Sequence, residues 1–126
     1  NGVKEKITFL KSDLFKSLKT VIKYDFIISN PPYIAENEIK KLSDEVKDHE
    51  PGISINGGKD GLDFYRNIIK KSPDYLVNNG YLAFEIGYKQ LEKVKQIFAK
   101  SKKFIIQKVI KDYSGIDRVI LAKKYG

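Results

Sequence analysis

The sequence predicts an α/β fold, a mostly parallel β-sheet with helices on its faces and an antiparallel final strand. Apolar, strand-like runs alternate with helical segments through most of the 126 residues. This alternation is typical of a parallel sheet with helical connections. The last two strand-like runs are joined only by a short loop, so they should pair antiparallel. With 41% hydrophobic residues, the chain can bury the core of one domain.

The first half of the chain is expected to contain two strands. Residues 6–11 (KITFLK) and 24–29 (YDFIIS) are short runs rich in β-branched and aromatic residues. The second run is apolar on both faces, as in a strand buried within a parallel sheet, and it must end at Pro31 because proline cannot donate to a β-ladder. A weak helical stretch is expected after a turn at residues 12–15, and a polar helix over residues 36–46.

The second half continues the alternation. After a glycine-rich loop over residues 48–59, a helix should begin at Asp60 or Gly61. Its apolar positions fall on one face at helical spacing: Leu62, Tyr65, Ile68 and Ile69. The residues Asn78-Asn79-Gly80 are a stop signal before the next strand. The later elements are expected over residues 81–86 (strand), 89–100 (helix, with Leu91, Val94, Ile97 and Phe98 inward), 104–111 and 118–123 (strands).

Composition and charge narrow the function classes. The chain has no cysteine and one histidine, so thiolate and histidine metal sites are excluded and we expect no metal. No apolar run approaches the ~20 residues of a membrane span, and no secretory signal is found, so a cytoplasmic protein without membrane contact is expected. A net charge of +8 would suit a nucleic-acid partner. However, the lysines are scattered and not interleaved with aromatic residues, which favours a merely lysine-rich composition.

The residues that indicate chemistry are Asn30-Pro31-Pro32-Tyr33, directly after the strand at 24–29. Ligands of open α/β sheets bind beyond the carboxyl ends of the strands. An amide nitrogen is a poor nucleophile, so an enzyme that methylates it must hold the NH₂ group in line with the methyl group of S-adenosylmethionine. The Asn30 side-chain oxygen and the Pro31 carbonyl can accept hydrogen bonds from the two N–H groups of this amide. Two prolines stiffen the loop, and the Tyr33 ring offers a flat surface for a planar amide or base. Pro-Pro alone would indicate only a turn.

Several motifs, in order, resemble those of the HemK/PrmC protein-(glutamine-N5) methyltransferases, which modify the Gly-Gly-Gln glutamine of peptide-chain release factors. The matching segments are FLKSDLF (9–15), DFIISNPPYI (25–34), HEP (49–51), GGKDGLDFYRNII (57–69), GYLAFEIGYKQ (80–90) and DRV (117–119). Asn-Pro-Pro-Tyr alone would not separate this family from adenine methyltransferases acting on DNA or RNA, whereas the later segments do. The resemblance implies S-adenosyl-L-methionine as methyl donor and a release factor as partner.

The resemblance also implies roles for the loop, position by position. Asn30 would bind the substrate amide and lie near the cofactor, while Pro31, Pro32 and Tyr33 would complete the amide pocket.

Other roles have alternatives that stay open. Asp13 and Leu14 would lie at the adenine edge of the cofactor, although Asp13 could instead cap the helical stretch after it. Glu50 would lie beside the substrate glutamine, although a solvated loop carboxylate is the alternative. Glu85, inside an apolar strand, is expected to be structural and to find a partner such as Arg118 or a backbone N–H.

The chain departs from the family pattern near its start. It has no Asp/Glu-x-Gly-x-Gly-x-Gly cofactor loop and no small N-terminal helical domain. We therefore expect residues 1–126 to be the C-terminal part of one catalytic domain, a Rossmann-like class I methyltransferase fold whose first two strands are missing. Such a fragment should bind the cofactor weakly and be inactive alone. The strand at 6–11 would be loosely held, pair with 24–29, or pair with another copy through an exposed edge.

Two other functions remain open at this point. One is an adenine methyltransferase acting on nucleic acid, which the basic charge mildly favours. The other is a truncated product without catalytic activity.

Overall fold

The computed structural model of the protein describes residues 4–39, 41 and 56–126. Its elements, in chain order, are η1 (Lys4–Lys6), β1 (Tyr24–Ser29), α1 (Glu36–Ile39), α4 (Asp63–Lys71), η2 (Ser72–Asp74), β2 (Leu76–Glu85), α5 (Leu91–Ser101), β3 (Phe104–Lys111) and β4 (Asp117–Lys124). The predicted Glu50, and the predicted helix beyond residue 41, lie outside the described residues.

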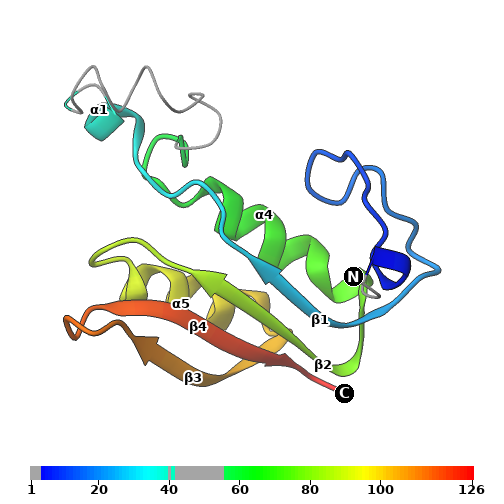
Figure 1. Cartoon of the computed structure of the whole chain (residues 1–126). Helices are drawn as coiled ribbons and strands as arrows, with labels where there is room; N and C mark the ends of the chain where they lie inside the picture. The colour runs from blue at the N-terminus through cyan, green and yellow to red at the C-terminus, as the bar shows by residue number, and fades with distance from the viewer. Residues whose placement is uncertain (1–3, 40, 42–55) are drawn as a thin grey trace.

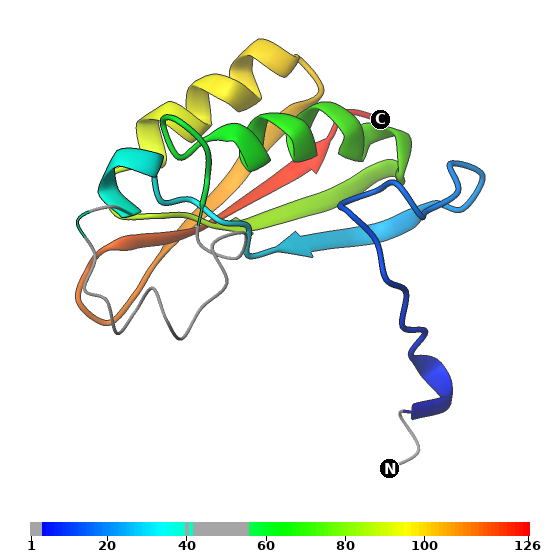
Figure 2. The ribbon, with the colours of Figure 1, turned by 90° about the horizontal axis from the view of Figure 1, so that it is seen from above.

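The four strands form one sheet in the order β1-β2-β4-β3. β1 runs parallel to β2, and β4 runs antiparallel to both β2 and β3. The antiparallel end of the sheet is therefore confirmed, and the parallel part of the described sheet is the β1–β2 pair. Helices α4 and α5 lie side by side on the same face of this sheet (Figures 1 and 2).

The core lies between these two helices and the sheet. The face of the sheet that α4 and α5 cover carries Leu82, Phe84, Ile120 and Ala122, all fully buried. Aromatic rings connect the layers, since Phe84 packs edge-on against Tyr65 of α4 with ring centroids 5.3 Å apart and lies 5.9 Å from the ring of Phe98 on α5. The predicted inward faces of both helices are confirmed. Tyr65, Ile68, Ile69, Val94 and Phe98 are buried, and Leu91 and Ile97 pack partly buried against them.

Both helices begin later than predicted, and backbone conformation explains it. α4 begins at Asp63 because Gly61 has φ of 80°, a left-handed conformation that ends a turn and cannot belong to a helix. α5 begins at Leu91 because Lys89 also has a left-handed φ, of 62°. In each case a tight turn comes directly before the first residue of the helix.

The predicted stop at Asn78-Asn79-Gly80 is wrong, because these residues lie within β2. The register between β1 and β2 shifts between the pairs Tyr24–Leu76 and Phe26–Tyr81. Asn79 has φ of 62°, a conformation that asparagine tolerates better than most residues. The three residues therefore form a bulge that interrupts the ladder locally, and the strand continues through it.

The expected strand over residues 6–11 is also wrong. Residue 6 ends η1, and residues 7–11 are irregular and pair with no strand of the described chain. The side chain of Phe9 is 86% exposed, and the segment leads away from the sheet (Figure 2). The turn expected at residues 12–15 is present, with Leu14 at a left-handed φ of 52°. The weak helix expected after it is wrong, because the backbone there closes separate turns, from the Leu18 N–H to the Phe15 carbonyl and from the Ile22 N–H to the Lys19 carbonyl.

β1 is present as predicted, but it is not buried on both faces. Phe26 is 49% exposed and Ile28 is 75% exposed. Both alternate along β1 with Ile27, which pairs with the buried Leu82, so they lie on the face opposite to α4 and α5. No helix of the described residues packs on that face of the sheet (Figure 2). The apolar pattern of β1 is thus typical of a strand whose two faces are both covered, but the described elements cover only one face of this strand. We call this exposed surface of Phe26 and Ile28 the open face.

Candidate functional site

The Asn30–Tyr33 loop leaves the carboxyl end of β1, where Ser29 pairs with Phe84 of β2. Asn30 is exposed, Pro31 is buried, and Pro32 and Tyr33 are half-buried. The two prolines have fixed φ angles and no N–H donors. The sequence therefore places a stiff loop at the edge of the sheet where ligands of α/β proteins bind, as predicted.

A cavity of about 680 Å³ brings the predicted cofactor residues together with this loop. Asn30 and Pro32 line it from the loop, Asp13 and Leu14 from the segment before β1, and Phe64 from α4. The remaining lining residues are Lys11, Ser12, Lys16 and Ser17. Two motifs that are separate in the sequence thus form one pocket, of the size that small-molecule ligands occupy.

Asp13 presents an exposed carboxylate at this pocket. Lys16 lies 2.9 Å from it, and the hydrogen bond and charge of Lys16 lower the pKa of Asp13 below its ordinary value. The alternative that Asp13 caps a helix is wrong, because turns and not a helix follow it. Leu14 has the left-handed backbone noted above. That conformation is uncommon for residues other than glycine, and such strain collects at functional sites.

A second hollow, of about 300 Å³, lies at the carboxyl ends of β1 and β2. It is lined by Ile28, Ser29, Asn30, Phe84, Glu85 and Val119. Asn30 therefore borders both hollows. A molecule bound in one and a side chain bound in the other would meet at this residue.

Of the two partners expected for Glu85, Arg118 or a backbone N–H, Arg118 is wrong. Arg118 donates from Nε to Asp112 Oδ2 at 2.9 Å, and not to Glu85. Charged hydrogen bonds from Arg118 and backbone N–H groups lower the pKa of Asp112, with the backbone of Ile116 the largest cause. Glu85 needs no such partner because its side chain is only half-buried, at the wall of the second hollow.

Three glycines allow close packing around Tyr33, which the sequence did not indicate. A Cβ atom on Gly57 would lie 2.7 Å from Tyr33 Cα, and one on Gly87 would lie 2.5 Å from Tyr33 Cδ2. One on Gly61 would collide with the Tyr33 carbonyl oxygen. Gly57 and Gly61 appeared in the sequence to be turn and helix-start glycines, but they also leave the room that the loop occupies.

Gln90, which the sequence reasoning also missed, bonds to the loop directly. Its Nε2 donates to the carbonyl oxygen of Tyr33 at 2.8 Å, and its Oε1 accepts from the N–H of Gly87 at 2.9 Å. The only sequence signal was its place in the segment GYLAFEIGYKQ.

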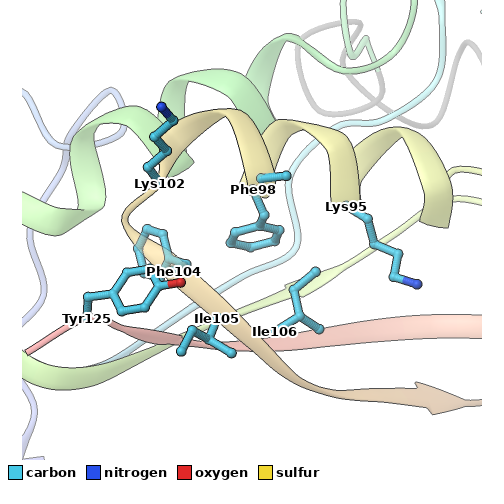
Figure 3. A pocket seen from close by; sticks show the side chains of 8 residues that line it. Lys95, Phe98, Lys102, Phe104, Ile105, Ile106 and Tyr125 are labelled. Carbon is cyan, nitrogen blue, oxygen red and sulfur yellow. The ribbon is translucent and has the colours of Figure 1, made fainter.

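A third hollow, of about 490 Å³, lies away from the loop between α5 and β3 (Figure 3). The rings of Phe98, Phe104 and Tyr125 line it (Figure 3). Lys95 of α5 and Lys102, directly after α5, extend outward (Figure 3). None of the predicted site residues that the structure describes contributes to it, so we do not assign it to the site.

The described residues were also compared with the requirements of a metal site and of a membrane-spanning helix. Within residues 4–39, 41 and 56–126, no group of three or more His, Cys, Asp or Glu side chains could hold a metal ion. Over the same part of the chain, no helix has the length and apolar character needed to cross a membrane.

Comparison with known proteins relates the chain to methyltransferases. The family model of the Eco57I restriction-modification methylase matches residues 1–117. The release factor glutamine methyltransferase of Fusobacterium nucleatum is 48% identical over 120 residues, which is 95% of this chain and 34% of that protein. That of Thermodesulfovibrio yellowstonii is 44% identical over 98% of this chain and 43% of that protein. The chain thus spans less than half the length of either relative.

A solved structure agrees with these relatives. The crystal structure of the release factor-specific protein-(glutamine-N5) methyltransferase from Alicyclobacillus acidocaldarius superposes with a TM-score of 0.52 at 29% identity. The match covers 82% of this chain and 50% of that one.

Proposed function

We propose, for a chain that belongs to the Eco57I restriction-modification methylase family, that the full-length protein methylates a glutamine side-chain amide in a peptide-chain release factor. The chain is similar to release factor glutamine methyltransferases in sequence and in structure, which supports this proposal. The fold is that of the Rossmann-like class I methyltransferases. We place residues 1–126 in the C-terminal part of a single catalytic domain, because the sheet ends in the antiparallel pair β4–β3.

The observation that carries the proposal is the position of Asn30 between two hollows. The larger one suits S-adenosyl-L-methionine, since the Asp13 carboxylate can accept hydrogen bonds from an adenosine group while Leu14 and Phe64 offer apolar surface to its base. When bound, this cofactor supplies an electrophilic sulfonium methyl group. The smaller hollow, beside Glu85, has room for the glutamine side chain.

The loop would act by positioning. The Asn30 side-chain oxygen and the Pro31 carbonyl accept hydrogen bonds from the two N–H groups of the glutamine amide and orient its nitrogen toward the methyl group. Because the prolines hold these acceptors in place before the substrate arrives, little reorganisation is needed at the moment of transfer. No general base is required, since the methylated amide nitrogen becomes acidic enough to lose its proton to water.

The remaining roles are part of the same proposal. Pro32 and Tyr33 complete the amide pocket, and Glu50 is proposed to lie beside the substrate glutamine. The partner is a release factor carrying a Gly-Gly-Gln loop, and the reaction takes place in the cytoplasm, where translation terminates.

Transfer of labelled methyl groups tests the proposal. The full-length protein is incubated with methyl-labelled S-adenosylmethionine and either a release factor, the same factor with the Gly-Gly-Gln glutamine replaced by alanine, or an adenine-containing DNA duplex. We expect label only in the unaltered release factor, on the peptide that contains this glutamine. Label in the duplex, with none in the release factor, would favour the adenine methyltransferase instead. No transfer to either substrate would contradict the proposal.

A further inference from the structure

Gln90 joins the loop to the end of β2 through both ends of one side-chain amide. It lies directly before α5 and is half-buried. Its Nε2 donates to the carbonyl of Tyr33 and its Oε1 accepts from the N–H of Gly87, at 2.8 and 2.9 Å. We propose that Gln90 is a positioning residue for methyl transfer, acting through Tyr33 on Asn30 and the Pro31 carbonyl. This inference rests on the proposed function.

The two contacts require one donor and one acceptor at a fixed separation. A carboxamide provides both, whereas an ionised glutamate provides acceptors only and would place negative charge against the Tyr33 carbonyl. The Oε1 atom also lies 3.4 Å from the hydroxyl of Tyr65, whose shorter hydrogen bond, of 3.0 Å, goes to the carbonyl of Glu85. Burial raises the pKa of Tyr65, so its hydroxyl keeps its single proton and donates it to the Glu85 carbonyl. The N–H of Gly87 is therefore the closer donor to Gln90 Oε1.

The surrounding glycines show that the bridge has little room to move. A Cβ on Gly87 would lie 2.7 Å from Gln90 Oε1, and one on Gly61 would lie 3.0 Å from Gln90 Nε2. The same two substitutions would also press on Tyr33. The Gln90 amide and the Tyr33 backbone therefore share one closely packed space, and the amide sets the distance between the loop and the end of β2.

The stiffness of the loop transmits this constraint to the reacting groups. Pro31 and Pro32 have restricted φ angles, so the backbone between Asn30 and Tyr33 has few conformations once the Tyr33 carbonyl is held. If the hydrogen bond from Gln90 to the Tyr33 carbonyl is lost, the Asn30 side chain and the Pro31 carbonyl, which accept from the substrate amide, are held in place less firmly. A displacement of about 1 Å at a reacting group can lower a rate about 10²-fold.

The test compares Gln90→Glu with Gln96→Glu in the full-length protein. Gln96 is an exposed residue on the same helix, so it controls for the added charge. We expect Gln90→Glu to lower kcat for glutamine methylation by about 10- to 100-fold at neutral pH, with little change in KM for the methyl donor, because Gln90 does not line the cofactor pocket. Gln96→Glu should match the wild type.

The pH dependence separates positioning from a general loss of structure. A protonated glutamic acid regains a donor for the Tyr33 carbonyl. The ratio of variant to wild-type kcat should therefore rise as pH falls through the pKa of the new carboxyl group. A ratio that stays constant with pH, or a kcat equal to that of the wild type, would overturn the inference.

Hydrogen exchange provides a readout that does not need activity. In Gln90→Leu the Gly87 amide loses its acceptor, so its exchange should accelerate, while amides in the middle of β4 keep their protection. Unchanged protection of the Gly87 amide would contradict the hydrogen bond from Gly87 to Gln90 on which the inference depends. If the protein methylates no glutamine but Gly87 responds in this way, the proposed function fails while the bridge stands.

Discussion

Replacing Gly57 by alanine tests whether the loop is held by close backbone packing. Gly57 is buried, and its N–H donates to the carbonyl of Ile34 at 2.8 Å. An added Cβ would lie 2.7 Å from Tyr33 Cα, 2.8 Å from Tyr33 C and 2.8 Å from the carbonyl oxygen of Gly61. All three are backbone atoms, so no side chain can rotate away to make room.

The expected cost follows from these contacts. Gly57 does not have a left-handed φ, so alanine adds no backbone strain there and the penalty comes from overpacking, about 1–3 kcal/mol. The smaller entropy of the unfolded alanine variant offsets about 0.4–1 kcal/mol. We therefore expect the free energy of unfolding to fall by about 1–2 kcal/mol, and the Tyr33 backbone to be pushed away from its position.

Gly115→Ala is the matched control. Gly115 has φ of 80°, and no atom of the described residues lies within 4 Å of the added Cβ. Alanine there costs left-handed strain, about 1–2 kcal/mol. Urea unfolding should thus show similar losses for both variants. Methyl transfer by the full-length protein should fall about 10-fold or more for Gly57→Ala alone. Equal activities of the two variants would refute the argument that this glycine positions the loop.

Three further predictions concern the core, pH and the open face. Phe84 is fully buried, so Phe84→Ala should lower the free energy of unfolding by about 3–5 kcal/mol in a urea titration. The hydrogen bond from Arg66 lowers the pKa of Asp60 from 3.8 to about 2. The ionised Asp60 should therefore make the wild type more stable than Asp60→Asn above pH 3.8, and this extra stability should be lost as pH falls through about 2. Because this pair is nearly half exposed, the difference should be only about 0–1 kcal/mol by urea unfolding at each pH. Ile28→Lys should reduce the binding of a dye that fluoresces on apolar surfaces, measured on this chain, and change stability by only about 0.5 kcal/mol.

The helix faces and the closing strands could be predicted because local pattern and tertiary burial agree there. Apolar spacing placed Tyr65 and Phe98 in the core, and a loop too short for a crossover made β3 and β4 antiparallel. Whether a strand-like run joins the sheet is harder to predict from local pattern, because it depends on partner strands elsewhere in the chain. Residues 7–11 have the composition of a strand but find no partner among the described strands, and a strand without a ladder leaves its backbone groups to water.

The candidate site could be predicted where a short motif carries the chemistry. The Asn30–Tyr33 loop lies at the end of β1 as expected, and Asp13 and Leu14 share a pocket with Asn30. The support of the loop could not be predicted. Gln90 is 57 residues from Tyr33 along the chain, so only the fold brings its amide to the Tyr33 carbonyl.

The most direct measurement of the central claim is the single-turnover rate of glutamine methylation by the Asn30→Ala variant of the full-length protein. The control is Asn37→Ala, which removes an exposed amide from α1. With cofactor and release factor both saturating, we expect Asn30→Ala to lower the rate by about 10²-fold or more, and Asn37→Ala to leave it unchanged. An Asn30→Ala variant that transfers the methyl group as fast as the wild type would contradict the account.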